Sequence, residues 1–232
     1  MNVLAVLAHP DDEVLGCGGA LAKHACAGDS VHVLTFTDGI GSRFAGGVPD
    51  PDLCRTRLLE YARATSVLGT QRAWNLSAYP DLRDQELDAV PRLVLARHVA
   101  RELAEIGPVG TIYTHWLGDL NQDHRAVAEA VLMATRPMAD TDRDRPRLLA
   151  CEVPESTSQA FGFAPFVPNV FVALHDHYVH EKLRALACYE SERRTVPHPR
   201  SPERVADRMR WWGSVSGCHA AEAFVLVREV LA

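Results

Sequence analysis

Several features that mark other protein classes are absent from this sequence. No uninterrupted apolar run reaches the roughly 18 residues of a transmembrane helix, and the first residues lack the basic leader of a signal peptide. The six cysteines include no C-x-x-C pair, so neither a zinc knuckle nor a disulfide framework is indicated. The formal net charge is -6, and acids interleave with the short basic clusters, which argues against nucleic-acid or anionic-membrane partners. We therefore expect a cytoplasmic protein that binds neither.

The apolar residues follow an alternation of strands and helices. With 232 residues and 47% apolar content, residues 1–232 are expected to form a single domain around one substantial core. Continuous apolar runs predict strands at 3–7, 31–36, 73–76, 109–114, 170–174 and 223–227. Longer segments between or after them predict helices at 16–27, 54–68, 86–106, 123–135, 178–191 and 201–212. This order indicates an α/β, Rossmann-like three-layer fold, with a mainly parallel sheet flanked by helices and an active site at the C-terminal strand ends.

Two segments interrupt the alternation. Residues 37–51 hold four glycines and two prolines and predict a long loop. Residues 136–168 hold five prolines, a charge cluster and three phenylalanines, so we expect a loop-rich insertion there. Two interpretations of the insertion stay open, a lid over the site and a surface excursion without function.

Polar residues with metal-binding chemistry follow two of the predicted strands. In segment 8–13, AHPDDE, three acids and a histidine occupy five successive positions at the mouth of a buried strand. Clustered carboxylates raise one another's pKa, and a bound divalent cation removes that cost. Segment 114–125 follows another strand and runs into a helix whose first turn holds Asp123 and His124. Either segment alone fits a turn with a capping aspartate, but the two together favour a metal site.

The two segments supply a ligand set and a base. His9, Asp12 and His124 offer two imidazoles and one carboxylate, which suit catalytic Zn²⁺ with one position open for water. The same set is compatible with Fe²⁺ or another divalent ion, and it converges only if the two strands are neighbours. Asp11 is the candidate general base, because it adjoins a ligand but points elsewhere. Asp123 is expected to orient an imidazole.

These segments resemble the signatures of a known family, the PIG-L/LmbE-like zinc-dependent N-deacetylases. Segment 8–13 matches the family's first motif, and segment 119–125, DLNQDHR, is similar to its second. Weaker similarities occur in the expected order at 38–39, 57–60, 79–81, 182–191, 198–201 and 221–224. The resemblance implies zinc held by His9, Asp12 and His124, with Asp11 as the general base. It also implies N-acetylglucosamine-containing glycosides as typical substrates, and it is compatible with a homo-oligomer.

One position departs from the family's pattern. Many members carry a histidine three residues before the last ligand, where this chain has Asn121. Asparagine can donate a hydrogen bond to an oxyanion but cannot act as a general acid. Protonation of the leaving amine then falls to Asp11, to His115 or, as a weaker alternative, to His198. His115 fits equally well as a structural residue that forms hydrogen bonds at a strand end.

Three residues near predicted strand ends are candidates for substrate contacts: Arg43, Arg57 and Asp81. Their guanidinium and carboxylate groups pair well with sugar hydroxyls. Each also fits a surface or helix-capping ion pair. For Arg57 this second interpretation is favoured, because Glu60 lies one turn further along the predicted helix.

Together these features predict a metal-dependent amidohydrolase that releases free amine and acetate from an N-acylated amino sugar, glycoside or aminoglycoside-like metabolite. Two alternatives from other classes stay open. One is a non-catalytic sugar- or nucleotide-binding module at the same strand ends, and the other is a non-haem Fe(II) enzyme with the same triad. No G-x-G-x-x-G follows the first strand, which argues against dinucleotide binding.

Overall fold

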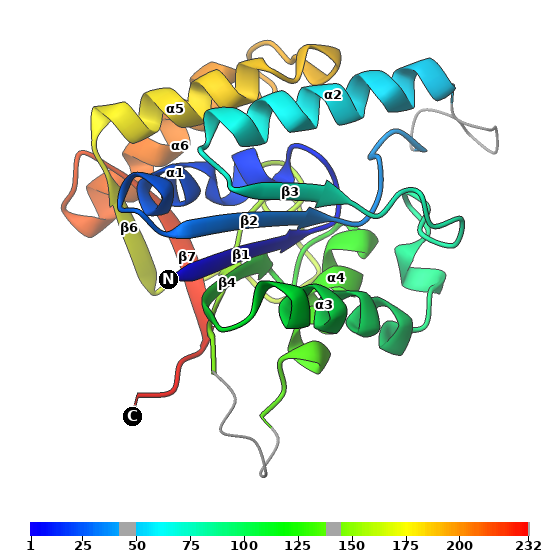
Figure 1. The fold of residues 1–232 in the computed structure, drawn as a ribbon. Coiled ribbons are helices and arrows are strands. Elements are labelled where there is room, and N and C mark those ends of the chain that lie inside the picture. Colours follow the sequence, from blue (N-terminus) through cyan, green and yellow to red (C-terminus); the bar gives the residue numbers. More distant parts are fainter. Residues whose placement is uncertain (42–49, 138–144, 232) are drawn as a thin grey trace.

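The computed structural model describes residues 1–41, 50–137 and 145–231, and within these ranges seven strands form one mixed sheet (Figure 1). The strands are β1 Asn2–Leu7, β2 Ser30–Thr35, β3 Arg72–Asn75, β4 Val109–His115, β5 Arg147–Cys151, β6 Val170–Leu174 and β7 Ala220–Arg228. Their order across the sheet is β3-β2-β1-β4-β5-β7-β6. Strands β1 to β5 pair in parallel, whereas β7 is antiparallel to both β5 and β6. The predicted α/β fold with a mainly parallel sheet is confirmed.

Helices cover both faces of this sheet. They are α1 Asp12–Cys26, α2 Pro51–Val67, α3 Arg92–Ile106, α4 Gln122–Ala134, α5 Asp176–Ala187 and α6 Pro202–Ser216. Helices α1, α2, α5 and α6 lie on one face, and α3 and α4 lie on the other, so the fold has three layers (Figure 1). None of the described helices is long and apolar enough to span a bilayer.

Strand β1 lies at the centre of both cores, which explains its continuous apolar sequence. Val3, Ala5 and Leu7 face the core beneath α1, α2 and α5. Leu4 and Val6 alternate with them and face the core beneath α3 and α4. Successive strand side chains point to opposite faces, so a strand covered on both sides needs apolar residues at every position.

The order of the strands places the polar segments together. From β1 the chain moves outward through β2 and β3, and then returns to the other side of β1 to form β4. The two strands pair directly, with Val3 opposite Thr111 and Ala5 opposite Tyr113. A crevice forms at such a reversal point, outside the C-terminal strand ends. The adjacency that the predicted ligand set requires is therefore present.

The helix starts of α1 and α3 differ most from the prediction. Helix α1 begins at Asp12 rather than at residue 16, because Asp11 turns the chain with φ 100° and its carbonyl accepts a hydrogen bond from the Leu15 N–H. Helix α3 begins at Arg92 rather than at residue 86, after a separate 3₁₀ turn at Leu87–Ala89. Pro91, which occupies the position before α3, disfavours helical backbone at the residue ahead of it.

The expectation for residues 136–168 is wrong in one part. Arg147–Cys151 forms strand β5, which pairs with β4 and β7 inside the sheet. The strand is only five residues long, and Pro146 and a charge cluster precede it, so its local composition resembles a loop. The rest of the described segment, which runs from β5 to β6, contains no further strand or helix.

Small residues let α1 pack closely against the sheet. A Cβ atom at Gly16 would lie 2.6 Å from the Cys151 Sγ, and one at Gly19 would lie 2.5 Å from a Leu174 methyl carbon. The Glu222 carboxylate of β7 accepts the Gly19 N–H at 2.8 Å and pairs with the buried Lys182 ammonium at 2.6 Å. These contacts fix α1, whose first residue is a candidate ligand, against β5, β6 and β7.

Candidate metal centre

The three predicted ligands converge at the ends of β1 and β4. His9 follows β1, Asp12 is the first residue of α1, and His124 lies in the first turn of α4. The His9 Nδ1 lies 3.1 Å from the Asp12 Oδ2 and 3.2 Å from the His124 Nε2, and the last two atoms are 3.4 Å apart. All three side chains are buried. A single ion placed between these atoms would contact all three residues.

The distances and the free donor atoms of the triad fit a divalent cation. One donor atom from each residue lies within 4.8 Å of the others. The Asp12 Oδ1 is buried and has no hydrogen-bond partner in the described part of the chain, so it remains able to bind an ion. Burial lowers the pKa of His124, but the charge of Asp12 and the hydrogen bond to Asp119 outweigh it and raise that pKa overall. The surroundings therefore favour positive charge at this point, which a metal ion supplies.

The other nitrogen of His9 faces two carboxylates. Its Nε2 lies 3.0 Å from the Asp84 Oδ1 and 3.2 Å from the Asp123 Oδ2. The Asp123 carboxylate is itself fixed, because it accepts the Gln85 N–H at 2.7 Å and the Leu87 N–H at 3.0 Å. Burial lowers the pKa of His9, but hydrogen bonds to the surrounding carboxylates outweigh this effect and raise it well above its ordinary value. The imidazole that Asp123 contacts is therefore His9.

Asp119 has the same relation to the second histidine, a contact that was not predicted from the sequence. Its Oδ1 lies 3.2 Å from the His124 Nδ1 and accepts the Asn121 N–H at 2.8 Å. Its Oδ2 accepts hydrogen bonds from the hydroxyls of Ser156 and Thr157. A carboxylate on the far nitrogen fixes the tautomer and ring orientation of a ligating histidine. The signal was present in the sequence, since Asp119 opens the motif at 119–125.

We expect Asp119→Asn to weaken Zn²⁺ binding by about 10–100-fold, because the amide keeps the size of the side chain but loses the charge that orients His124. Competition with a chromophoric chelator measures this affinity. Asp207→Asn is the matched control, since Asp207 is exposed on α6 and, among the described residues, pairs only with arginines of the same helix. An unchanged affinity in Asp119→Asn would refute the orienting role.

His115 lies buried between β1 and the first turn of α4. Its Nε2 accepts the Ala8 N–H at 2.9 Å, and its ring stacks on His124 with 3.9 Å between the centroids. Burial and the neighbouring His124 charge hold the pKa of His115 well below its ordinary value. Because Nε2 accepts a backbone N–H, the ring proton lies on Nδ1, which is buried and has no hydrogen-bond partner among the described residues. This geometry favours the structural alternative over the role of general acid.

Asn121 stands at the N-terminus of α4. Its side-chain Oδ1 accepts the Asp123 N–H at 2.9 Å, which makes it the cap of this helix. The cap fixes the start of the helix and with it the position of His124. The amide Nδ2 of Asn121 makes no hydrogen bond within the described residues, so it can still donate to a substrate oxygen.

Two arginines hold the candidate base. The Asp11 side chain is buried, and its Oδ2 lies 2.9 Å from the Arg57 Nη2 and 3.4 Å from the Arg200 Nη1. Arg57 also donates to the Pro10 carbonyl, so it braces the whole turn. The ion pair expected between Arg57 and Glu60 is present but long, at 4.0 Å. Arg57 therefore acts on Asp11 rather than lying on the surface.

A second buried acid, Glu13, forms hydrogen bonds that stabilise the same turn. Glu13 accepts the Asp11 N–H through Oε2 at 3.0 Å and the Tyr189 hydroxyl through Oε1. Burial raises the pKa of Glu13 to about 8. The Arg57 guanidinium stacks over the Tyr189 ring at 4.8 Å, which links the segment that follows α5 to the base. The sequence pointed to Tyr189 only through the weak similarity at 182–191.

The remaining predicted contacts have different outcomes. Arg43 lies outside the described residues. Asp81 is exposed, and the carboxylate that the structure brings to His9 from this loop is Asp84. His198 lies beside Glu155, with 3.6 Å between the His198 Nε2 and the Glu155 Oε2.

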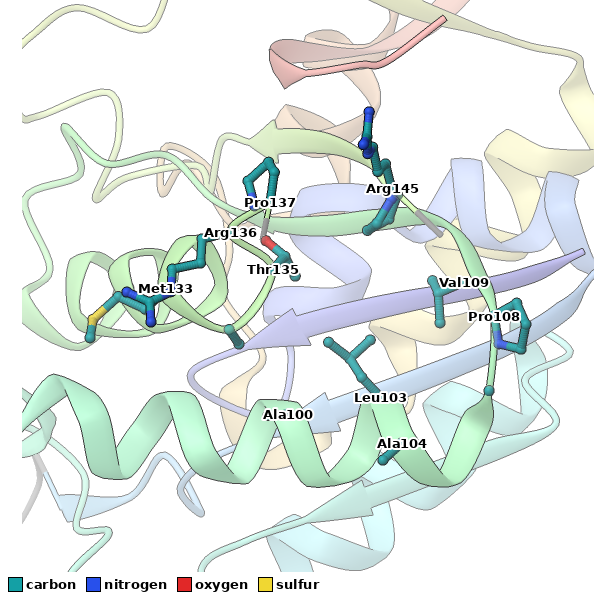
Figure 2. Close-up of a pocket in the computed structure, with 13 residues that line it drawn as sticks. Ala100, Leu103, Ala104, Pro108, Val109, Met133, Thr135, Arg136, Pro137 and Arg145 are labelled. Atoms are coloured by element: carbon teal, nitrogen blue, oxygen red, sulfur yellow. The ribbon is translucent and has the colours of Figure 1, made fainter. Parts of the chain in front are cut away.

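Two of the cavities among the described residues lie at opposite ends of the parallel strands. The larger, of about 540 Å³, is lined by Leu103, Val109 and Met133 among others, at the ends of α3 and α4 (Figure 2). Val109 is the first residue of β4, so this cavity lies at the N-terminal ends of the strands, remote from the triad. The smaller, of about 120 Å³, is lined by Asp11 and Arg200 and adjoins the candidate base.

The matching family model and two proteins of similar sequence all describe deacetylases. Residues 4–135 match the family model described as PIG-L, GlcNAc-PI de-N-acetylase. The uncharacterized deacetylase YaiS of Escherichia coli is 28% identical over 190 residues, which cover 82% of this chain and 91% of that protein. The diacetylchitobiose deacetylase of Thermococcus kodakarensis is 31% identical over 202 residues, which cover 82% of this chain and 70% of that protein.

Solved structures share the fold across nearly the whole chain. The conserved protein TT1542 of Thermus thermophilus has a TM-score of 0.71 and 28% identity, covering 99% of this chain and 96% of that one. GalB, the 4-carboxy-2-hydroxymuconate hydratase of Pseudomonas putida, has a TM-score of 0.67 and 20% identity, covering 100% and 98%. Because one of these structures is a hydratase, the reaction has to be argued from the site and not from the fold.

Proposed function

Since the chain belongs to the PIG-L family, we propose that it is a metal-dependent amidohydrolase that removes an N-acyl group from an amino sugar or a related small metabolite. The observation that carries the proposal is the convergence of His9, Asp12 and His124 beside Asp11, a further carboxylate that the triad does not use. The sheet draws strands from both ends of the chain, which supports treating residues 1–232 as one catalytic domain.

The proposed ligands are His9, Asp12 and His124, with Zn²⁺ as the favoured ion. An ion held there supplies Lewis acidity toward water and toward the amide carbonyl. Asp11 accepts the proton of the attacking water while the water oxygen bonds to the carbonyl carbon. Both arginines contact the Asp11 Oδ2, so the proton resides on Oδ1. The C–N bond then breaks, and Asp11 returns the proton to the amine nitrogen, which leaves a free amine and a carboxylate such as acetate.

The remaining roles follow from which donors are still available. We assign the Asn121 Nδ2 as a donor to the developing oxyanion, because its Oδ1 is occupied by the helix cap. His115 is left as a structural support, since its Nε2 accepts a backbone N–H. Asp11 is therefore the group proposed to protonate the leaving amine.

The proposed substrate class comes from named relatives. The Thermococcus kodakarensis protein acts on diacetylchitobiose, and a Nakamurella multipartita relative, 32% identical over 197 residues, acts on an inositol acetamidodeoxyglucoside. Both names describe an acetamido sugar. We propose that this chain acts on an acetamido sugar or glycoside of similar size.

An amine-release screen tests the proposal. The protein is incubated with N-acetylated sugars, glycosides and aminoglycoside-like compounds, with Zn²⁺, with Fe²⁺ under anaerobic conditions, or with a chelator. The proposal expects primary amine from at least one compound with metal and none with chelator. Sugar binding without amine release under any metal would favour a binding module instead. Air-sensitive turnover with iron alone and without amine release would favour the Fe(II) enzyme.

A further inference from the structure

The cavity beside Asp11, called here the arginine cavity, is lined by both apolar and charged residues. Its volume is about 120 Å³, well below the roughly 300–1,000 Å³ of pockets that hold whole ligands, so it fits one substituent of a substrate. The apolar part of its wall is Leu15, Leu186, Ala187, Tyr189 and Pro202. Because Asp11 is also part of this wall, a group in the cavity adjoins the proposed base.

The residues that line the cavity carry more positive than negative charge. Arg193, Arg194 and Arg200 line the cavity, against the two acids Asp11 and Glu192. This local excess contrasts with the net charge of -6 on the whole chain.

Both acids that line the cavity already form ion pairs with arginines. Glu192 lies 3.3 Å from the Arg194 Nη2 and 3.6 Å from the buried Arg57 Nη1. Asp11 pairs with Arg57 at 2.9 Å and with Arg200 at 3.4 Å. Arg193 is exposed and forms no ion pair within the described residues. Its guanidinium is therefore available to a ligand.

Arg200 is also held by contacts with Glu155 and His198. Its Nε lies 3.0 Å from the Glu155 Oε2, and its backbone N–H donates to the His198 Nδ1 at 3.1 Å. His198 faces the same Glu155 oxygen at 3.6 Å. The side chain of Arg200 keeps 24% of its surface exposed, so it is fixed and still accessible. Segment 198–201, which supplies no residue to the metal site, thus holds Arg200 at the cavity.

We propose that the arginine cavity is a subsite for an anionic group of the substrate, a carboxylate or a phosphate, with Arg193 and Arg200 as its ligands. This inference rests on the proposed function, because it names the substrate class of the same site. The planar guanidinium fork matches both anions. The substrate is then an acidic N-acyl amine, whose anionic group lies next to the amide.

The test compares matched probes. N-acetylglucosamine is the neutral probe, N-acetylglucosamine 6-phosphate carries a phosphate, and N-acetylmuramic acid carries a carboxylate. We expect kcat/KM for at least one anionic probe to exceed that of the neutral probe by about tenfold, and this preference to shrink at high salt. The two anionic arms distinguish a phosphate from a carboxylate subsite.

Charge variants connect the preference to the cavity. Arg193→Gln is expected to reduce the anionic preference to about twofold, and Arg193→Glu to reverse it. Arg204→Gln is the matched control, because Arg204 is a nearby arginine that pairs with Asp207 on the exposed face of α6 and does not line the cavity. The control should keep the wild-type preference.

Calorimetric binding of glucosamine 6-phosphate against glucosamine gives a readout that needs no turnover. Tighter binding of the phosphate compound, lost in Arg193→Glu, supports the subsite even if no probe is hydrolysed, and that combination would count against the proposed function alone. Equal kcat/KM for all three probes, or a preference that Arg193→Glu leaves unchanged, would overturn the anionic subsite while amine release from the neutral probe would leave the proposed function intact.

Discussion

Asp11→Asn is expected to lower kcat for amide hydrolysis by about 10²–10⁴-fold while one equivalent of Zn²⁺ is still bound. The amide cannot accept the proton of the attacking water, whereas the triad atoms of His9, Asp12 and His124 are not altered. Arg57 and Arg200 can still donate to the amide oxygen. Chemistry is lost in this variant, and the metal site is retained.

Asparagine is a better replacement than alanine here, because Asp11 adopts φ 100°. Asparagine tolerates positive φ, but alanine would add backbone strain of about 1–2 kcal/mol to the turn that positions Asp12. Steady-state kinetics and metal analysis of the same sample provide the measurement. Asp207→Asn serves as the control for loss of an acid. A fully active Asp11→Asn protein would exclude Asp11 as the base.

His124→Ala is expected to remove both activity and metal-dependent stabilisation. Losing one of three protein ligands leaves His9 and Asp12 to hold the ion. Lewis-acid catalysis contributes several kcal/mol, so kcat/KM should fall by at least about 10³-fold. A bound ion also stabilises the folded state, so the Tm of the wild-type protein should rise with added Zn²⁺ and that of the variant should not.

Thermal melts with and without Zn²⁺ separate this effect from simple unfolding. His180→Ala is the control, because His180 is exposed on α5. The control should retain both the activity and the metal-dependent rise in Tm. A His124→Ala protein that keeps one equivalent of tightly bound metal would show that the triad is assigned wrongly.

The sequence was sufficient for the parts of the site that lie close to strand ends. The segments 8–13 and 114–125 each follow a buried strand, and an open parallel sheet brings such ends together where the strand order reverses. The pairing of β1 with β4 is the step that spacing could not supply. Asp123 was expected to orient an imidazole, but its partner, His9, lies 114 positions away in sequence.

Residues that reach the site from distant loops left no local signal. Arg200 lies 189 positions from Asp11, and their contact depends on how α5 and α6 pack over α1. Asp84, which no sequence motif indicated, lies beside His9 and precedes Gln85, a residue with φ 66°. Strand β5 was missed because a short strand is recognisable only through its pairing with β4 and β7, not from its own five residues. Tertiary contacts decide all three cases.

The most direct test of the account is a metal titration of chelator-treated wild-type protein, with amine release from an N-acetylated substrate as the readout. We expect negligible activity without metal and a rise that reaches its maximum at one equivalent of Zn²⁺ per chain. Full activity in the metal-free protein would contradict a reaction that depends on His9, Asp12 and His124 as metal ligands.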